Sequence, residues 1–181
     1  MADNDNVMTT QALYQMKLLD SVMRESQRMN VTIPVRFVRR VKADITLSDG
    51  TRLPAGSTIQ VPSSEPKLDA SYYSEPHRFN PYRFYDIRAG KVQDPLNFKN
   101  KEQYQFISVN KENTSFGYGR HACPGRFFAA NEIKLILARI LLDYDIKMPE
   151  GQHGRFPNLF NGTSVNPDPT RQVMFKYVAN A

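Results

Sequence analysis

The chain contains a single cysteine, Cys123, and therefore cannot form an internal disulfide. This excludes the disulfide-stapled class of secreted proteins and favours a reducing compartment. No run approaches the roughly 18 apolar residues that cross a bilayer. The first residues, MADNDNVMTT, are polar and acidic, unlike a signal peptide. As given, the chain is therefore expected to be soluble and intracellular.

The chain also lacks an excess of acidic charge, since 24 Lys and Arg outnumber 18 Asp and Glu and the formal net charge is +6. The basic residues are scattered, and the densest group, Arg36 to Lys42, fits an exposed strand, so we expect no nucleic-acid partner. Apolar residues make up 40% of the 181 residues and charged residues 23%, which is ordinary for a folded protein. This length allows one domain with one sizeable core.

The N-terminal third of the chain shows helical and then strand-like patterns. We expect a disordered tail over residues 1–10 and an amphipathic helix over 11–29. Alternation over 35–47, a Ser-Asp-Gly turn and a second alternating run over 58–61 predict a small antiparallel sheet. Residues 62–115 have little periodicity, and a loop of this length is usually functional or wrapped around something.

A strong helical pattern returns over residues 124–144, and a strand is predicted near the end, over 172–178. The segment between them is predicted to be loop. Lys134 is expected outside the apolar stripe of the helix, which comprises Ala129, Ile133, Ile136, Leu137, Ile140, Leu141 and Tyr144.

Cys123 lies between a glycine-rich loop and this helix, in the stretch FGYGRHACPGRFFA. Pro124 suits a first helical position, so Cys123 is expected at or near the N-cap, where free N–H groups and the helix dipole stabilise an anion. A thiol in such a place is readily a thiolate, and hence a nucleophile or a soft metal ligand. Gly117 and Gly119 let the backbone turn sharply and leave room for a flat, bulky group.

Two other roles for this thiol remain open from the residues alone. A zinc site normally needs clustered ligand pairs, yet besides His121 the chain offers only His77 and His153. A Cys-His nucleophile is a second alternative, although His121, two residues before Cys123, is an unusual place for a general base.

Two further motifs are weak by themselves. Glu25 and Arg28 in RESQR lie three residues apart, so they share a helix face and can pair. Pro81 to Phe84 in HRFNPYRF form an aromatic-rich turn that contains one arginine, Arg83.

The order of these motifs, Glu-x-x-Arg, then Pro-x-Arg-Phe, then Phe-x-x-Gly-x-His-x-Cys-x-Gly opening a long helix, resembles the C-terminal part of a cytochrome P450. The resemblance runs from about Thr9 to Val178. It implies a truncated piece of that fold over residues 11–178, mainly α with small β-sheets (α+β).

The resemblance also implies roles for individual residues. Cys123 would be the axial thiolate on the iron of haem b, since an anionic sulfur donates electron density that favours O–O cleavage. Phe116 would pack near the haem, and Gly119 and Gly125 would allow close approach of the porphyrin. A buried structural network would join Glu25, Arg28 and Arg83.

One position departs from the family pattern, because His121 stands where an arginine that reaches a haem propionate is common. Arg120 or His121 could bind the propionate, the histidine with pH dependence. Arg39 or Arg40 could supply a further contact, and Arg40 is the candidate included with Arg120 and His121. Filamentous-fungal members often carry a similar loop.

By the same resemblance, the function is that of a haem-thiolate monooxygenase, which would use dioxygen and two electrons from NADPH-cytochrome P450 reductase to hydroxylate an apolar small molecule. Residues 33–37 and 161–165 could contribute to its pocket. A full relative is expected at the endoplasmic reticulum membrane facing the cytosol, through an N-terminal anchor that this sequence lacks along with the distal, oxygen-activating helix. The alternatives are a non-catalytic truncated product without stable haem binding and, more distantly, a cysteine-nucleophile hydrolase.

Overall fold

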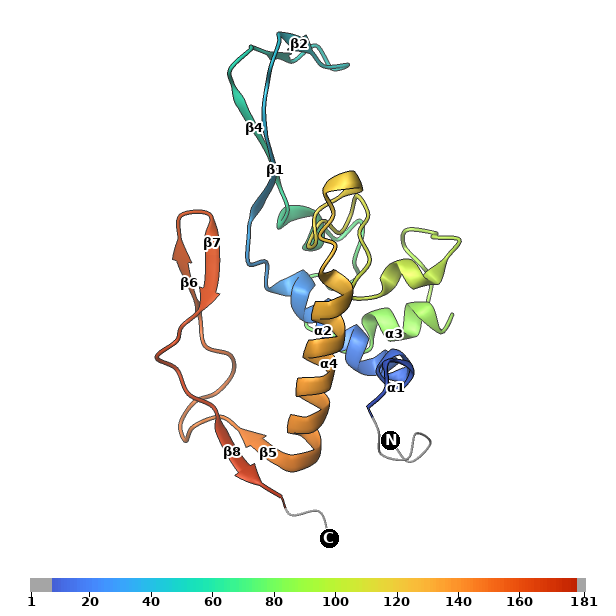
Figure 1. Ribbon diagram of the computed structural model, residues 1–181, viewed down its shortest axis with the longest axis vertical. Coiled ribbons are helices and arrows are strands. Elements are labelled where there is room, and N and C mark those ends of the chain that lie inside the picture. Colours follow the sequence, from blue (N-terminus) through green and yellow to red (C-terminus); the bar gives the residue numbers. More distant parts are fainter. Residues whose placement is uncertain (1–7, 179–181) are drawn as a thin grey trace.

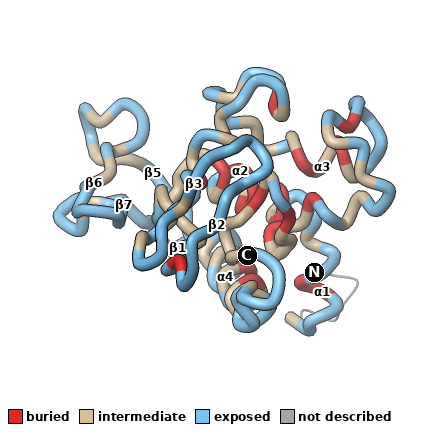
Figure 2. Tube along the Cα trace, turned by 90° about the horizontal axis from the view of Figure 1, so that it is seen from above, coloured by how far each residue is buried: buried red, intermediate tan, exposed pale blue. Residues whose placement is uncertain are grey.

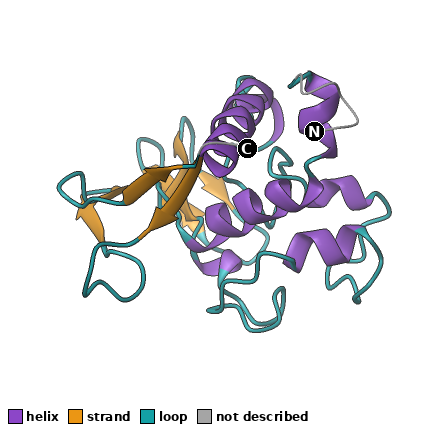
Figure 3. Cartoon of the chain, turned by 90° about the horizontal axis from the view of Figure 1, so that it is seen from below, coloured by secondary structure: helices purple, strands orange, loops and turns teal. Residues whose placement is uncertain are grey.

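The structure, a computed structural model, describes residues 8–178 of the chain. Helices and an irregular segment pack together in the body of the molecule, while the strands form slender two-stranded sheets that extend from it (Figure 1). Figure 3 shows the same separation of helices from strands from another side. The predicted class, mainly α with small β-sheets, is confirmed.

The N-terminal helical segment is broken at Met16. Helix α1 (Thr10–Gln15) starts at Thr9, whose hydroxyl accepts a hydrogen bond from Ala12 N at 3.1 Å, and helix α2 spans Lys17–Met29. Between them Met16 has a ψ of 60°, outside the helical region. The single helix predicted over 11–29 is therefore wrong at this point. The break lets α1 pack against α4, while α2 packs against α3. Of the expected tail over residues 1–10, residues 1–7 lie outside the described residues.

The predicted antiparallel sheet is present as strands β1 (Val35–Arg40) and β4 (Thr58–Pro62). The strand predicted over 35–47 is interrupted, and its end forms β2 (Ile45–Thr46), which pairs with β3 (Arg52–Leu53) at the tip of a projecting arm (Figure 1). A register shift between Arg36 and Arg39, at Phe37 with a φ of +56°, bends β1 where it leaves the body.

The segment 62–115 is largely irregular, as predicted, but it holds a core of its own. A short helix that the sequence pattern did not reveal, α3 (Arg83–Arg88), lies within it, beside 3-10 turns at Glu65–Lys67 and Lys101–Tyr104. The most buried apolar side chains of the segment pack around α3, and this core comprises Tyr73, Phe84, Ile87 and Tyr104. Figure 2 shows that buried residues concentrate around α2 and α3 rather than in the strands.

Helix α4 (Arg126–Asp143) is the longest described element and crosses α2 (Figure 1). The strand predicted near the end is confirmed as β8 (Met174–Tyr177), which pairs with β5 (Tyr144–Lys147). The segment between the long helix and this last strand was predicted to be loop. It contains a hairpin formed by β6 (Asn158–Asn161) and β7 (Ser164–Pro167). Its Asn-Gly turn at residues 161–162 was a signal that the prediction missed.

The predicted apolar stripe of α4 is confirmed only in part, since Ile133 and Leu137 pack against the core formed by Met23, Phe106 and Ala130. The fully buried residues are Ala130, Lys134 and Ala138, which follow one another at four-residue steps, whereas Ile136 and Leu141 are at least half exposed. The small Ala130 packs with Met23 of α2 and with Phe106, and Lys134 reaches the Asp20 carboxylate of α2. Within residues 8–178, none of the helices has the length and apolar character needed to cross a bilayer.

Candidate haem-thiolate site

The loop before α4 is closed by its own backbone. Cys123 N donates a hydrogen bond to Phe116 O at 2.7 Å, Gly117 N to Thr114 O at 2.8 Å and Ala122 N to Gly119 O at 3.0 Å. These bonds fix the residues on both sides of the sulfur. The Cys123 thiol itself is free and exposed at the surface of the loop.

Glycines shape this loop for two separate reasons. Gly117 has a φ of +81°, and a Cβ there would lie 2.9 Å from His121 O, so no larger residue fits without movement. Gly119 also has a positive φ, of +61°, but open space around it. Gly125 has an ordinary backbone, and a Cβ added to it would lie 3.9 Å from Cys123 Sγ. Its lack of a side chain leaves one side of the sulfur clear.

Cys123 was expected at or near the N-cap of the helix, and the structure places it two residues before the cap. Helix α4 begins at Arg126 with Gly125 as the N-cap, because Gly125 O accepts the first helical hydrogen bond from Ala129 N at 2.9 Å. Arg126 Nη1 instead holds Cys123 O at 2.7 Å. The sulfur is therefore positioned by the loop and by Arg126, ahead of the helix rather than as its cap.

The structure brings Glu25, Arg28 and Arg83 together. Arg28 forms two hydrogen bonds with the Glu25 carboxylate, at 2.8 and 2.9 Å, and Arg83 Nε reaches both of its oxygens, at 3.1 and 3.2 Å. Glu25 Oε1 also accepts from Asn80 N at 3.0 Å. Burial by itself would raise the pKa of Glu25, but the hydrogen bonds from Arg28 and Asn80 and the two guanidinium charges outweigh it, so the pKa is lowered below 4.5.

The remaining guanidinium hydrogens tie this network to the irregular segment. Arg28 Nη1 donates to the carbonyls of Lys67 and Pro76, both at 2.6 Å, and Arg83 Nη1 donates to Ser74 O at 2.5 Å. The network thus links α2 to residues 67–83. It lies in the interior and presents no free group to a ligand, which fits a structural role.

Arg120 and His121 lie on the exposed surface of the cysteine loop, where Arg120 Nε donates to His121 Nε2 at 3.2 Å. Arg40 is exposed on β1, and so is Arg39, whose guanidinium stacks over the Phe37 ring at 5.5 Å. Among residues 8–178, no three His, Cys, Asp or Glu side chains converge as a metal-binding group.

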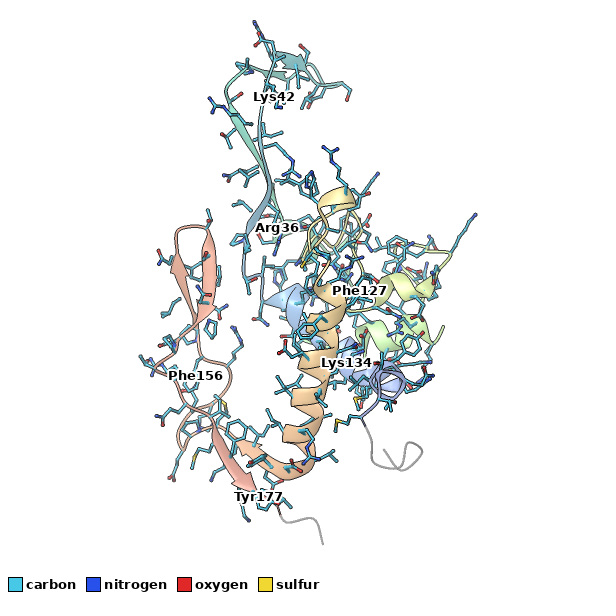
Figure 4. All side chains as sticks on the ribbon, viewed as in Figure 1. Arg36, Lys42, Phe127, Lys134, Phe156 and Tyr177 are labelled. Atoms are coloured by element: carbon cyan, nitrogen blue, oxygen red, sulfur yellow. The ribbon has the colours of Figure 1, made fainter. Side chains whose placement is uncertain are left out.

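Sequence reasoning missed Arg36, the residue of β1 that turns inward. Its Nε is buried without a hydrogen-bond partner, and burial lowers the pKa of its guanidinium. Arg36 lines a cavity of about 590 Å³ together with Phe116, Phe106 and Lys67. Figure 4 places it at the base of the arm, beside the cysteine loop. In a regular strand, alternation would place Arg36 and Arg39 on opposite faces and so distinguish the two in the sequence. The register shift at Phe37 breaks that alternation.

These features fit a haem whose iron is held by sulfur. The thiol is exposed and clear on its Gly125 side, and the unpaired Arg36 Nε offers a buried donor for an anionic oxygen. Phe37 and Tyr118 bring β1 and the cysteine loop into contact, with ring centroids 6.1 Å apart. The Cys123 thiol and the Arg36 guanidinium therefore lie in the same region of the molecule. A haem requires this, because it has both a metal centre and carboxylate groups.

The cysteine loop is a candidate site for a thiolate ligand, and comparison with known proteins identifies the family. The family described as Cytochrome P450 matches residues 1–175, so the chain belongs to the cytochrome P450 family.

Relatives in fungi share a large part of this sequence. The chain is 44% identical to cytochrome P450 monooxygenase 103 of Postia placenta, over 93% of the chain and 32% of that protein. It is 40% identical to cytochrome P450 monooxygenase braC of Annulohypoxylon truncatum, over 97% of the chain and 34% of that protein. The chain thus spans about a third of the length of the curated relatives it matches.

Among solved structures, the fold matches that of the retinoic acid-bound cyanobacterial CYP120A1. The TM-score is 0.71 at 22% sequence identity, and the match covers 94% of this chain and 34% of that one. This likeness shows the fold.

Proposed function

We propose that Cys123 is the axial thiolate ligand of haem b and that the chain carries the thiolate side of a monooxygenase that hydroxylates an apolar small molecule. The observation that carries this proposal is the exposed sulfur on a loop closed by the Cys123 N to Phe116 O bond. Bound haem supplies the activation of dioxygen, with two electrons delivered from a reductase.

The residues of this chain have distinct tasks around that group. Phe116 supports the loop from below through its edge-to-face contact with Phe106, and Gly125 keeps the sulfur accessible. Arg36 takes a haem propionate in preference to Arg40, because a buried unpaired donor gains a hydrogen bond whereas an exposed arginine exchanges one with water. Arg120 and His121, both exposed, are left as secondary contacts.

The substrate side is proposed from the segment after α2 and the β6–β7 hairpin. Val165 N donates to Thr32 O at 2.8 Å, and Val165 is buried. This bond joins the hairpin segment 161–165 to Thr32, which directly precedes the segment 33–37 and lines the cavity that contains Arg36. Their aliphatic residues suit an apolar substrate.

Cytochromes P450 generally receive electrons from a redox partner, and for this chain we propose NADPH-cytochrome P450 reductase at the cytosolic face of the endoplasmic reticulum. Arg126 is a candidate docking residue next to the cysteine loop, since it lies on the surface over the Phe127 ring. Lys134, a second basic residue of α4, is buried and paired with Asp20, and is therefore excluded as a surface contact.

The test is haem titration of the purified chain, followed by reduction and exposure to carbon monoxide. We expect a strongly red-shifted Soret band that is lost in Cys123→Ala and kept in His121→Ala, which removes a neighbouring ligand-type side chain without touching the sulfur. Absence of haem uptake would assign the chain to the non-catalytic alternative. An unchanged band in Cys123→Ala would refute the thiolate assignment.

A further inference from the structure

A second buried carboxylate on α2, that of Asp20, binds three separate parts of the molecule. Its Oδ1 pairs with Lys134 Nζ of α4 at 2.7 Å, and its Oδ2 pairs with Arg88 Nη1 of α3 at 3.2 Å. Oδ2 also accepts a hydrogen bond from Phe106 N at 3.0 Å. All three partners are buried groups, so this cluster is a separate network from the one around Glu25.

Two of these three contacts lead to the cysteine loop by separate routes. Phe106 packs edge to face on Phe116, with ring centroids 5.3 Å apart, and Phe116 O accepts the hydrogen bond from Cys123 N. Lys134 lies on α4, the helix that starts three residues after Cys123 (Figure 4). Asp20 thus links Phe106, which packs on Phe116 of the loop, to α4, the helix that follows the loop.

The contact between Asp20 and Lys134 depends on charge. The Lys134 side chain is 8% exposed and sits between the small residues Ala130 and Ala138, where its ammonium has little access to water. A buried ammonium needs an anionic partner, and Asp20 is the carboxylate that the structure pairs with it. Arg88, in contrast, also binds the partly exposed Glu102 at 2.9 Å, so it keeps a partner without Asp20.

We propose that Asp20 is a positioning residue for Cys123: through its bonds to Phe106 and Lys134 it fixes the position of the cysteine loop, residues 116–123, relative to α4. Its effect on haem spectra rests on the proposed role of Cys123, whereas its effect on the loop can be measured without haem.

The first experiment measures amide hydrogen exchange of the haem-free chain, comparing residues 116–123 with the amides of α3. In Lys134→Met the side chain packs without a charge, and Asp20 keeps Arg88 and Phe106. We expect exchange of the loop, relative to α3, to accelerate about tenfold, as loss of one charge-assisted hydrogen bond implies. Asp20→Asn, which keeps an acceptor for Phe106 N, should accelerate it at least as much.

Asp94→Asn is the matched control. Asp94 is also buried, accepts hydrogen bonds from the amides of Leu96, Asn97 and Phe98 and from the Tyr104 hydroxyl, and binds Lys101; its apolar partners Leu96, Phe98 and Tyr104 belong to the core around α3 and not to the one that contacts Phe116. We expect this variant to lose stability without a selective change in the loop. Equal acceleration in Asp94→Asn, or unchanged loop exchange in Lys134→Met, would overturn the proposal.

The second experiment records the carbon monoxide spectrum of the reduced, haem-loaded variants. Lys134→Met and Asp20→Asn should show a smaller share of the red-shifted thiolate band than Asp94→Asn at equal haem content. If the unaltered chain binds no haem, the proposed function fails while the exchange result still decides the role of Asp20. If haem binds and the band is the same in all three variants, the positioning role fails alone.

Discussion

Among the described residues, Lys67 is a buried cation without an anionic partner. Replacing Lys67 by methionine should show by how much its buried charge lowers the free energy of unfolding. The side chain is buried, and its Nζ donates to Ser115 Oγ at 2.5 Å and to Gln27 O at 3.4 Å. No carboxylate of the described residues pairs with it, and the nearest charges are cationic, those of Arg24, Arg36 and Arg28. Burial first, and these charges second, lower the pKa of Lys67 from 10.5 to about 7.

This lowered pKa makes stability depend on pH in a defined direction. Between pH 7 and pH 10.5 the unfolded chain holds the Lys67 proton and the folded chain has lost it, so the free energy of unfolding rises with pH. At about 1.4 kcal/mol per pKa unit, the full penalty of the charged form is about 5 kcal/mol. The gain expected between pH 7 and pH 9 is about 2 kcal/mol. Below pH 7 both states are protonated and the penalty is fully present.

Urea unfolding followed by circular dichroism, at pH values from 6 to 9, measures this effect. We expect the stability of the unaltered chain relative to Lys67→Met to be lowest at pH 6 and to rise by about 2 kcal/mol between pH 7 and pH 9. Lys42→Met, at an exposed lysine on the arm (Figure 4), is the control and should give a difference that does not change with pH. A difference independent of pH in Lys67→Met would refute the reasoning.

Three further outcomes can be measured on the same chain. Glu25→Gln leaves two buried guanidinium groups without a carboxylate, so urea unfolding should show a loss of about 3–5 kcal/mol, and a loss below about 1 kcal/mol would contradict the network. Gly117→Ala should lower the melting temperature more than Gly50→Ala, because both have positive φ but only the first meets a carbonyl, at 2.9 Å; equal losses would count against the close packing of the loop. Arg36→Leu should weaken haem binding about tenfold or more in a haem titration without destabilising the haem-free chain, whereas Arg40→Leu should change neither; a larger effect of Arg40→Leu would reverse the assignment.

Patterns among neighbouring residues were sufficient to predict several helices, strands and turns and the outline of the candidate site. The periodicity of α4, the turn at residues 48–50 and the strand at 174–177 depend on neighbours in the chain and were predicted from it. The pairing of Glu25 with Arg28 lies within one helix. The break at Met16 and the short helix α3 were not predictable in this way, because both serve contacts with distant segments that have no local pattern.

By itself, the sequence determined that a lone thiol stands between a glycine-bearing turn and a long helix, since Gly117 and the helical pattern are local properties of the chain. Tertiary structure decided which cations are buried. Lys134 looked like a solvent-facing lysine and is enclosed beside Asp20, while Arg36 rather than Arg40 faces the cavity. Burial is a sum over contacts from several elements, and the charge of a side chain is stabilised or penalised by whatever those elements bring next to it. Spacing along one segment does not contain that information.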